Sequence, residues 1–117
     1  MRALLAAHGW ADRVADQARF ANVVRWSERA LVAEEGGKVV AFGRVVTDGV
    51  WNGYLSMVVV DPGYRRRGIG TELVTELMGP GTGITWLLRA RDPDSMPFWE
   101  KLGFRHSEIT MEKLRET

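Results

Sequence analysis

The 117-residue chain lacks cysteine, has almost no net charge and contains no long apolar run. Without a thiol it forms no disulfide, holds no metal through thiolates and uses no cysteine nucleophile, and we assign it no metal site. Its formal net charge of +1 argues against extensive contact with nucleic acid or an acidic membrane, which normally requires a strongly basic face. No apolar run approaches the roughly 20 residues of a membrane span. We therefore expect a cytoplasmic protein with neither a nucleic-acid nor a membrane partner.

What is present is an ordinary globular composition, with 45% hydrophobic and 26% charged residues. This length suits one domain, so residues 1–117 are predicted to share a single core. The start, MRALLAAHGW, lacks the apolar length of a secretion signal and predicts a short helix over residues 2–8. A second helix is expected to begin at Asp12.

The middle of the chain predicts a meander of strands. Three apolar stretches have the composition of strands: Leu31–Ala33, Val39–Val46 and Tyr54–Val60. The pair Gly36-Gly37 predicts the hairpin turn between the first two. Pro62 ends the third, because proline donates no hydrogen bond to a neighbouring strand.

The last part of the chain predicts alternating helices and strands. The four-residue spacing of Ile69, Leu73 and Leu77 indicates an amphipathic helix from Ile69 to Met78. The order of elements predicts an α/β (α+β) fold in which helices cover a mixed sheet. Three further elements follow that helix: a central strand at Ile84–Ala90, a helix over about residues 93–102 capped by Asp92, and a last strand at Ile109–Leu114.

The segment VVVDPGYRRRGIGTEL, residues 58–73, places three arginines and two glycines between an apolar strand and an amphipathic helix. The start of a helix exposes unpaired N–H groups and the positive end of the helix dipole. Gly68 and Gly70 would let a bulky anion approach the backbone with no Cβ in the way, and Arg65 to Arg67 would pair with its oxygens. This context favours a phosphate cradle. The simpler interpretation is a solvated basic turn whose glycines only permit a tight connection.

The stretch VVVDPGYRRRGIGTELV resembles the coenzyme A-binding segment of the GNAT superfamily of N-acetyltransferases. Arg65 falls on the family's Gln/Arg position, and Gly68 and Gly70 fall on its two small-residue positions. A second stretch, DPDSMPFWEKLGF at residues 92–104, resembles the family's later helix that ends in F-Y-E-K-L-G-F. The resemblance covers roughly residues 30–115 and implies a GNAT-like fold, with a mixed, mostly antiparallel sheet flanked by helices. It also implies acetyl-CoA (coenzyme A) as the cosubstrate.

The resemblance assigns roles to individual residues. Backbone amides from Arg66 to Thr71 would bind the coenzyme diphosphate, and Val58 to Val60 would lie along the pantetheine arm. An amine of a small molecule or peptide would attack the thioester directly in a ternary complex, while the strand amide of Val59 or Val60 would hold the oxyanion. The implied cofactor-binding set is Val58, Val59, Val60, Arg65, Arg66, Arg67, Gly68, Ile69, Gly70 and Thr71.

The sequence identifies no catalytic acid or base. Trp99 occupies the position of the family's usual acidic tyrosine, and an indole N–H does not give up its proton at useful pH. We expect Trp99 to pack against the pantetheine arm of the coenzyme or to orient the sulfur. A water chain is as good a base as any side chain. The side-chain candidates are Glu34, Glu35, Asp48, His8 and His106, each of which also fits a solvated surface group.

The front of the chain departs from the family pattern as well. Family members usually begin with a strand ahead of the first helix, and nothing before residue 2 supplies one, so we expect either that the sheet lacks its first strand or that the chain begins late. Four aromatic residues are candidates either for an acceptor pocket or for plain core: Phe20, Trp26, Trp51 and Tyr54.

Three functions fit these features. The leading one is an acetyl-CoA-dependent N-acetyltransferase that acts on an amine. The alternative is a catalytically weak CoA-binding or sensing module of the same fold, which Trp99 and the missing base favour. A nucleic-acid contact through Arg65 to Arg67 is disfavoured by the low net charge. Dimerisation is common in the family, so a homodimer stays open, although the sequence shows no self-association surface.

Overall fold

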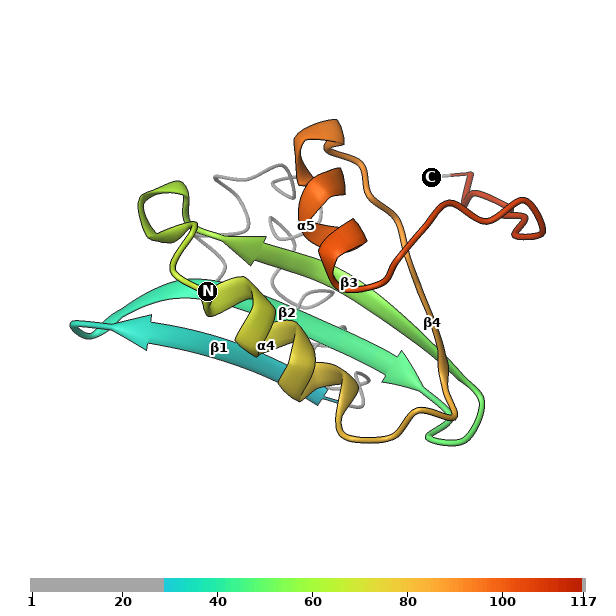
Figure 1. The fold of residues 1–117 in the computed structure, drawn as a ribbon, viewed down its shortest axis with the longest axis horizontal. Helices are drawn as coiled ribbons and strands as arrows, with labels where there is room; N and C mark the ends of the chain where they lie inside the picture. The colour runs from blue at the N-terminus through green and yellow to red at the C-terminus, as the bar shows by residue number, and fades with distance from the viewer. Residues whose placement is uncertain (1–28, 117) are drawn as a thin grey trace.

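The computed structural model describes residues 29–116, and the predicted helices over residues 2–8 and from Asp12 lie outside them, as does the question of a first strand. Four strands form one sheet in the order β1-β2-β3-β4 (Figure 1). Neighbours pair antiparallel except for β3 and β4, which are parallel. The expected mixed, mostly antiparallel sheet is confirmed. The strands are β1 (Arg29–Glu35), β2 (Lys38–Thr47), β3 (Asn52–Val60) and β4 (Thr85–Leu88).

Two local turns, one within the sheet and one at its end, form as the sequence predicts. Gly36 and Gly37 join β1 to β2 with φ values of 57° and 80°, a left-handed conformation at both positions that favours glycine. Asp61 ends β3: its carboxylate accepts a hydrogen bond from the Gly63 N–H at 3.0 Å and starts a short 3-10 turn, Pro62–Tyr64.

Two helices follow β3. Helix α4 (Ile69–Met78) has the predicted bounds and ends at Gly79, whose φ is 74°. A 3-10 turn begins behind Asp92, whose carboxylate accepts from the Asp94 N–H at 2.9 Å, and it leads into helix α5 (Met96–Lys101). The predicted cap and helix over about residues 93–102 are therefore confirmed.

The core described here lies between α4, the sheet and α5. Seven of its members are buried: Ala41, Val45, Leu55, Leu73, Val74, Leu77 and Trp99. Gly43 of β2 lets α4 approach the sheet, because a Cβ built there would lie 2.8 Å from Leu77 Cδ1. Burying a side chain of leucine size stabilises the fold by about 1.5–3 kcal/mol. The helix stripe read from the sequence therefore faces the sheet.

Two strand predictions were wrong. Within the described residues β4 lies at an edge of the sheet and spans only Thr85–Leu88, although a central strand over Ile84–Ala90 was expected. Residues 109–114, expected to form a last strand, have no regular structure, and Ile109 and Met111 are 93% and 94% exposed. Apolar composition marked both segments as strands, but pairing partners decide whether strands form. No helix in the described range is long and apolar enough to cross a membrane.

Candidate functional site

The parallel strands β3 and β4 separate along their length. Their pairing runs from Asn52 opposite Thr85 to Leu55 opposite Leu88 and then stops, while β3 continues to Val60. Figure 1 shows the two strands diverging, with α5 above the opening. The edge of β3 from residue 56 to residue 60 therefore borders a wedge between the strands, and we call this wedge the splay. Val58 to Val60, which the sequence assigned to the coenzyme arm, lie on this edge.

A bulge in β3 sits beside the splay. The register with β2 shifts between Phe42 and Arg44, where β3 carries one residue more than its partner. Met57, at the bulge, is buried and has φ of 56°, in the left-handed region that a non-glycine residue rarely adopts. Such a conformation costs on the order of 1–3 kcal/mol and persists only when the surroundings enforce it. The bulge sets the orientation of the last three residues of β3.

The backbone of Val60 faces the splay. The Asp61 N–H donates to the Val40 carbonyl of β2 at 2.8 Å, so Asp61 points toward β2. Successive residues of a strand direct their N–H and C=O groups to opposite sides. The backbone N–H and C=O groups of Val60 therefore point away from β2, and those of Val59 point toward it. Of the two amides considered for the oxyanion, only that of Val60 has the right direction.

The turn between β3 and α4 has a backbone shaped for anions. Arg66 and Gly68 have φ values of 65° and 80°, and alternation of left-handed with other residues turns successive N–H groups into one concavity. Gly68 is the residue that caps α4, and no side chain accepts its first-turn N–H groups. The amides of Ile69, Gly70 and Thr71 therefore face outward from the helix end, together with the positive end of its dipole.

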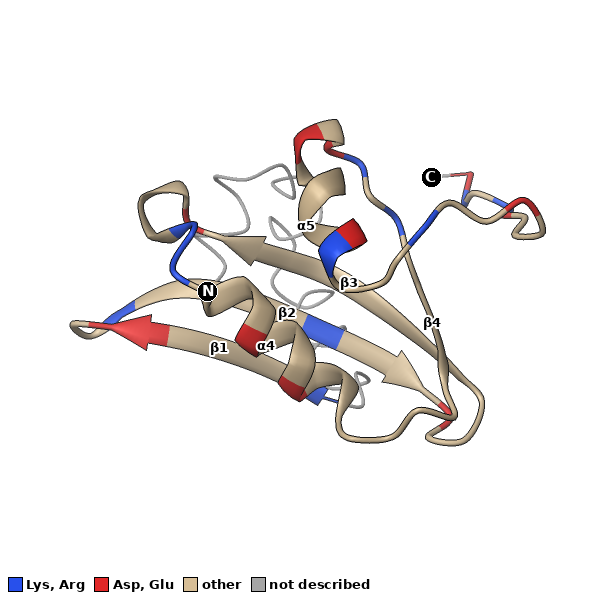
Figure 2. Cartoon of the chain, in the orientation of Figure 1, with Lys and Arg blue, Asp and Glu red and all other residues tan. Residues whose placement is uncertain are grey.

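The three arginines of the turn differ in their contacts. Arg65 donates from Nε to the Val60 carbonyl at 3.1 Å and thereby ties the turn to β3. Arg67 pairs with Glu35 of the β1–β2 hairpin at 3.2 Å and lies over the Tyr64 ring, 5.0 Å from its centroid. Arg66 is exposed and makes no ion pair with any residue in the described range. Figure 2 shows this basic turn beside the acidic end of β1.

The two glycines of the motif have different roles. Gly68 needs its left-handed backbone, and a Cβ built there would meet nothing within 4 Å. A Cβ at Gly70 would lie 3.1 Å from Phe98 Cε1 of α5 and 3.4 Å from Val60 Cγ2. The absence of a side chain at Gly70 thus has a packing role that the sequence did not show, and the predicted approach of an anion to Gly70 stays a prediction. That residue makes room for Phe98 and lets α4 pack against α5.

Trp99 packs in the core. It is 8% exposed and meets Phe98 and Phe104 edge to face, with ring centroids 4.9 and 5.4 Å away. The structure therefore shows Trp99 as a core residue, and both roles predicted for it toward the coenzyme stay predictions. An indole enclosed in this way supplies no proton to a reaction in the splay.

The proposed bases within the described range are engaged or solvated. Glu35 is occupied by Arg67, and Glu34 and His106 are exposed. Asp48 accepts backbone N–H bonds from Val50, Trp51 and Asn52 at the opposite end of β3, and these bonds, that from Val50 foremost, lower the pKa of its carboxyl. His8 lies outside the described residues, as do Phe20 and Trp26. Trp51 is 73% exposed at the tip of its hairpin and forms neither core nor pocket.

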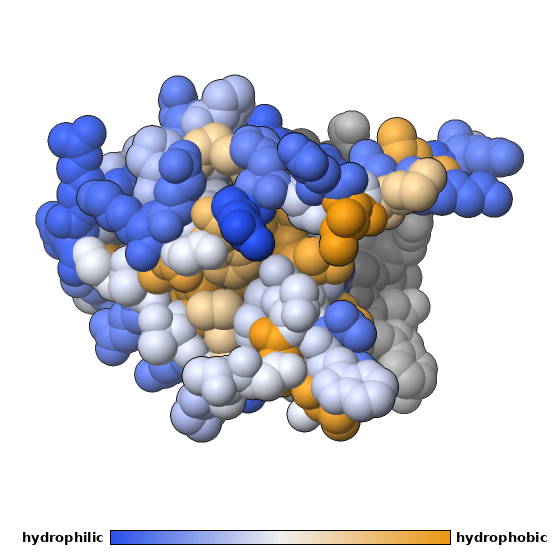
Figure 3. Space-filling model, turned by 45° about the vertical axis from the view of Figure 1, so that its right-hand side comes forward, coloured by the Kyte–Doolittle hydropathy of each residue, from blue (hydrophilic) through white to orange (hydrophobic). Residues whose placement is uncertain are grey.

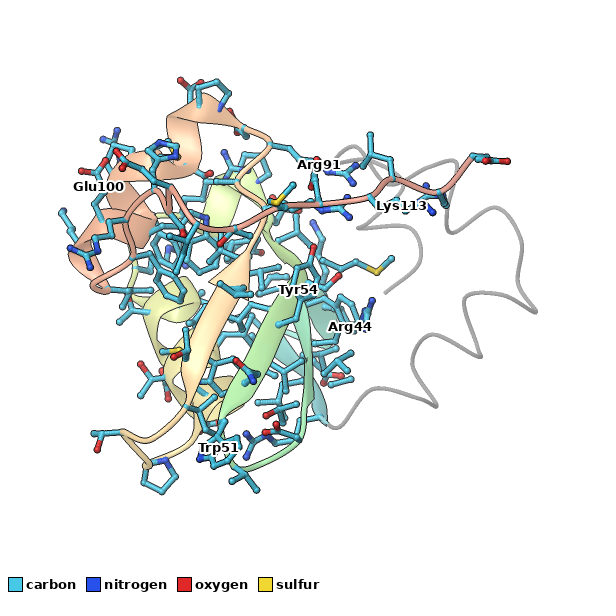
Figure 4. The ribbon with its side chains drawn as sticks, turned by 90° about the vertical axis from the view of Figure 1, so that its right-hand side faces the viewer. Arg44, Trp51, Tyr54, Arg91, Glu100 and Lys113 are labelled. Atoms are coloured by element: carbon cyan, nitrogen blue, oxygen red, sulfur yellow. The ribbon has the colours of Figure 1, made fainter. Side chains whose placement is uncertain are left out.

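One charged side chain escaped the sequence analysis. Arg44 lies on β2 opposite Ser56, on the face of the sheet away from α4, and Tyr54 lies beside it (Figure 4). Burial lowers the pKa of Arg44, and its interaction with Tyr54 partly reverses that effect. The signal was an arginine within the apolar strand sequence VVAFGRVV. The polar group Arg44, Tyr54 and Ser56 lies where β3 leaves β4.

The combination of a splayed parallel pair, a bulged strand and an open helix start agrees with the comparison of sequences. The profile of the Acetyltransferase (GNAT) family matches residues 3–104, most of the chain. The chain belongs to the GNAT family of acetyltransferases. The fold expected from the resemblance is thereby confirmed. The chain's relatives include enzymes named N-acetyltransferases, which are acyltransferases.

Named members of this family resemble the chain over different lengths. The [Ribosomal protein bS18]-alanine N-acetyltransferase of Escherichia coli (strain K12) is 31% identical over 107 residues, which cover 76% of this chain and 70% of that enzyme. The glucosamine 6-phosphate N-acetyltransferase of Trypanosoma brucei brucei is 39% identical over 61 residues, 50% of this chain. The match spans only 42% of the trypanosomal enzyme.

Solved GNAT structures share the fold. A GNAT family acetyltransferase from Streptococcus pneumoniae TIGR4 superposes with a TM-score of 0.77 and 25% identity over 97% of this chain and 87% of that one. Glucosamine-6-phosphate N-acetyltransferase from Arabidopsis thaliana gives a TM-score of 0.66 and 25% identity, over 97% of this chain and 88% of that one.

Proposed function

We propose that this protein transfers the acetyl group of acetyl-CoA to an amine by direct attack in a ternary complex. The observation that carries the proposal is the position of two features at one end of β3. The open strand edge up to Val60 leads directly into the turn whose N–H groups point outward. A coenzyme with a diphosphate at one end and a thioester arm at the other fits this sequence of surfaces.

The turn at the start of α4 would bind the diphosphate. Backbone N–H groups from Gly68 to Thr71 donate to phosphate oxygens without losing hydrogen bonds inside the helix. Arg66 adds a mobile positive charge at the rim. Arg65 acts indirectly, because its bond to the Val60 carbonyl fixes the turn relative to the strand edge.

The edge of β3 would position the thioester. Bound acetyl-CoA supplies an activated acyl group, and the chain's own part is to hold the arm along the strand and the carbonyl oxygen near an N–H donor. The Val60 amide, which faces the splay, is the donor that we assign to the oxyanion. A fixed backbone donor of this kind typically contributes about 10²–10³-fold to the rate.

The acceptor must lose a proton before it attacks, since an alkylamine with a pKa of about 10 is mostly protonated at pH 7. The candidate bases Glu34, Glu35, Asp48 and His106 are engaged in other contacts or solvated, so we assign the removal of this proton to water. The relatives named above act on an amino sugar phosphate and on an alanine of a ribosomal protein. An amine of a small molecule or of a peptide is therefore the proposed acceptor class.

A second candidate is a catalytically weak module that binds CoA. The enclosed indole of Trp99, at the position where the family usually has an acidic tyrosine, favours it. The two functions share the coenzyme site and differ in thiol release. Acetyl-CoA binding without release of CoA in the presence of any amine would support the module.

The coenzyme site is tested with a matched pair of variants, Gly68→Asp and Gly68→Asn. Both side chains tolerate a left-handed backbone, and they differ in charge, so their difference isolates the anion. We expect calorimetry to show acetyl-CoA binding at least about 30-fold weaker for Gly68→Asp than for Gly68→Asn. S-acetylpantetheine, which lacks the diphosphate, should bind both equally. Equal acetyl-CoA affinity in the two variants would remove the turn from the site, and thiol release over an amine panel then tests the transfer itself.

A further inference from the structure

The face of the sheet away from α4 carries positive charge that the proposed coenzyme site does not use. The alternation of side chains along β2 shows which residues lie there, because Ala41 and Val45 belong to the core beneath α4 and a Cβ at Gly43 would meet that helix. Arg44 therefore points to the opposite face, which we call the far face. Its side chain is half-buried in the apolar middle of β2 and interacts with Tyr54 of β3.

Arg44 lies at the point where the splay begins. It is paired in register with Ser56 of β3, and the pairing of β3 with β4 stops one residue earlier, at Leu55. The small side chain of Ser56 leaves space for the guanidinium above β3, and the interaction with Tyr54 places the charge over that strand. The far face therefore carries a positive charge beside the start of the splay.

A second arginine borders the splay from the side of β4. Three residues at the end of β4 and just beyond it pack against the core beneath α4: Trp86, Leu88 and Ala90. Arg89 and Arg91 alternate with them and therefore lie on the far face. Arg89 is paired with Glu112 at 3.3 Å, whereas Arg91 is exposed and makes no ion pair with any residue of the range 29–116. Figure 4 shows Arg91 and Arg44 on the same side of the sheet.

The other face of the splay, the near face, is covered by helices. Phe98 of α5 lies against Gly70 of α4, and the two helices share one core. Figure 3, which looks onto this side and the β4 edge, shows apolar atoms in its middle. A thioester held in the splay would be shielded on the near face, so an acceptor would reach it from the far face, past the two arginines.

We propose that the acceptor is a small amine that also carries a phosphate or carboxylate group, and that Arg44 and Arg91 bind this group beside the splay. The inference rests on the proposed acetyl transfer and names its acceptor class. In the transfer, the amine nitrogen bonds to the acetyl carbon and the C–S bond breaks. The ammonium form of the acceptor loses two protons, of which one goes to water and one to the CoA thiolate.

The charges favour this class over a plain amine. A guanidinium presents N–H groups in a planar fork that matches a carboxylate or a phosphate. An acceptor that carries only an ammonium charge would be repelled by Arg44 and Arg91, and an anionic group on the same molecule offsets that repulsion. Burial disfavours the charged form of Arg44 and lowers its pKa, and a nearby anion favours the charged form.

The spacing along β3 favours a small molecule. A strand advances by about 3.3 Å per residue, so Val60, the proposed oxyanion donor, lies roughly 13 Å along the strand from Ser56. The long side chain of Arg44 covers part of this distance from the position opposite Ser56. The anionic group and the amine are therefore expected to be separated by only a few bonds.

Matched amines test the acceptor class with the full chain and saturating acetyl-CoA. Ethanolamine is compared with O-phosphoethanolamine, and propylamine with β-alanine, so that the members of each pair differ in one anionic group. We expect the release of CoA thiol to show a kcat/KM at least about 10-fold higher for the anionic member. The two pairs also show whether phosphate or carboxylate is preferred. Equal kcat/KM within both pairs would overturn the inference.

Variants test the two arginines through this preference, the ratio of kcat/KM for the anionic and the neutral amine. Arg44→Met should lower the preference about 10-fold, and Arg44→Lys, which keeps the charge, should lower it less. Arg91→Gln should lower it about 3-fold, and because Arg91 is exposed this variant carries the test even if Arg44→Met does not fold. The control Lys101→Gln removes an exposed charge from α5 and should leave the preference unchanged. An unchanged preference in the arginine variants, or an equal loss in the control, would contradict the assignment.

Two further readouts separate this inference from the proposed function. At saturating acetyl-CoA, inorganic phosphate should inhibit transfer to β-alanine competitively with the amine, and an absence of such inhibition would count against an anion site on the far face. Loss of acetyl-CoA binding in calorimetry, or no thiol release with any amine, would overturn the transferase and this inference together. Intact acetyl-CoA binding with transfer to neutral amines alone would overturn the inference and leave the transferase in place.

Discussion

The connections at the two ends of β3 differ in whether a side chain accepts their backbone N–H groups. At the hairpin end, the Asp48 carboxylate accepts three of them, from Val50, Trp51 and Asn52, at 2.8, 2.8 and 3.1 Å. At the other end, Gly68 begins α4 with no side-chain acceptor for the first turn. One connection satisfies its N–H groups with its own carboxylate, and the other leaves the first N–H groups of its helix without a side-chain acceptor, as the proposed phosphate site requires.

The charges follow the same division. Asp48 places a negative charge inside the hairpin loop, whereas Arg65, Arg66 and Arg67 surround the open helix start. Because the Asp48 carboxylate already accepts the N–H groups of its loop, that loop has no free donors for a second anion. A candidate anion site is therefore recognised less by its glycines than by N–H donors that have no neighbouring side chain as acceptor.

The largest effect is expected at Gly70. Gly70→Val should lower the free energy of unfolding by about 1–3 kcal/mol, because the new side chain meets Phe98 and Val60. Urea unfolding measures the loss. Gly63→Val is the control, since a Cβ at Gly63 meets only Asp61 Oδ1, at an ordinary 3.5 Å. Unchanged unfolding together with lost coenzyme binding would contradict the packing role of Gly70 and leave it a role in the anion site alone.

A smaller effect, on coenzyme affinity, should distinguish two arginines of the turn before α4. Arg66→Ala should weaken acetyl-CoA binding about 10-fold, because this side chain makes no ion pair in the described structure and is available to a phosphate. Arg67→Ala should weaken acetyl-CoA binding about 3-fold or less, since Arg67 is already paired with Glu35. Calorimetry at two salt concentrations measures both. Equal losses would mean that the contact with Glu35 opens when the coenzyme binds.

A change at Asp48, in the β2–β3 hairpin, should affect stability alone. Asp48→Asn keeps the shape but accepts N–H bonds more weakly, so the thermal midpoint should fall by about 2–5 °C with acetyl-CoA affinity unchanged. Because the folded state lowers the pKa of Asp48, its contribution is present above the unfolded value of about 4 and is lost as pH falls further. From pH 5 to pH 3, the variant should therefore lose less stability than the parent. A parallel loss in both proteins would exclude this carboxylate.

The smallest effect is expected at the tip of the same loop. Trp51→Ser removes a side chain that is 73% exposed, so unfolding should change by less than about 0.5 kcal/mol. Acetyl-CoA affinity should also stay the same, because the tip and the basic turn are at opposite ends of β3. Reduced transfer to one acceptor with intact coenzyme binding would reveal that the acceptor reaches this loop.

Features with a local cause were predicted well from the sequence. The turn at Gly36 and Gly37, the helix Ile69–Met78 and the cap at Asp92 depend on residues within a few positions of one another. The family motif also assigned Val60 and the arginine turn to one coenzyme site, which stays a prediction. The residue types and spacings that produce these elements can be read directly from the sequence.

Features that depend on distant partners were not predicted. The bulge at Met57 has no glycine to announce it, and it is visible only in the register with β2. The role of Gly70 depends on Phe98, which lies on another helix. The edge position of β4 depends on which strands pair with it. Periodicity describes one element at a time, so packing between elements is beyond its reach.

The extra residue at Met57 changes the phase of β3. Leu55 lies in the core, and Val58 and Val60 pack against the same core, although residues 55 and 58 would face opposite sides of a regular strand. Removal of one residue at the bulge would turn Val58 and Val60 out of the core and redirect every amide after it. This point in the chain therefore tolerates exchange of side chains far better than any change in length.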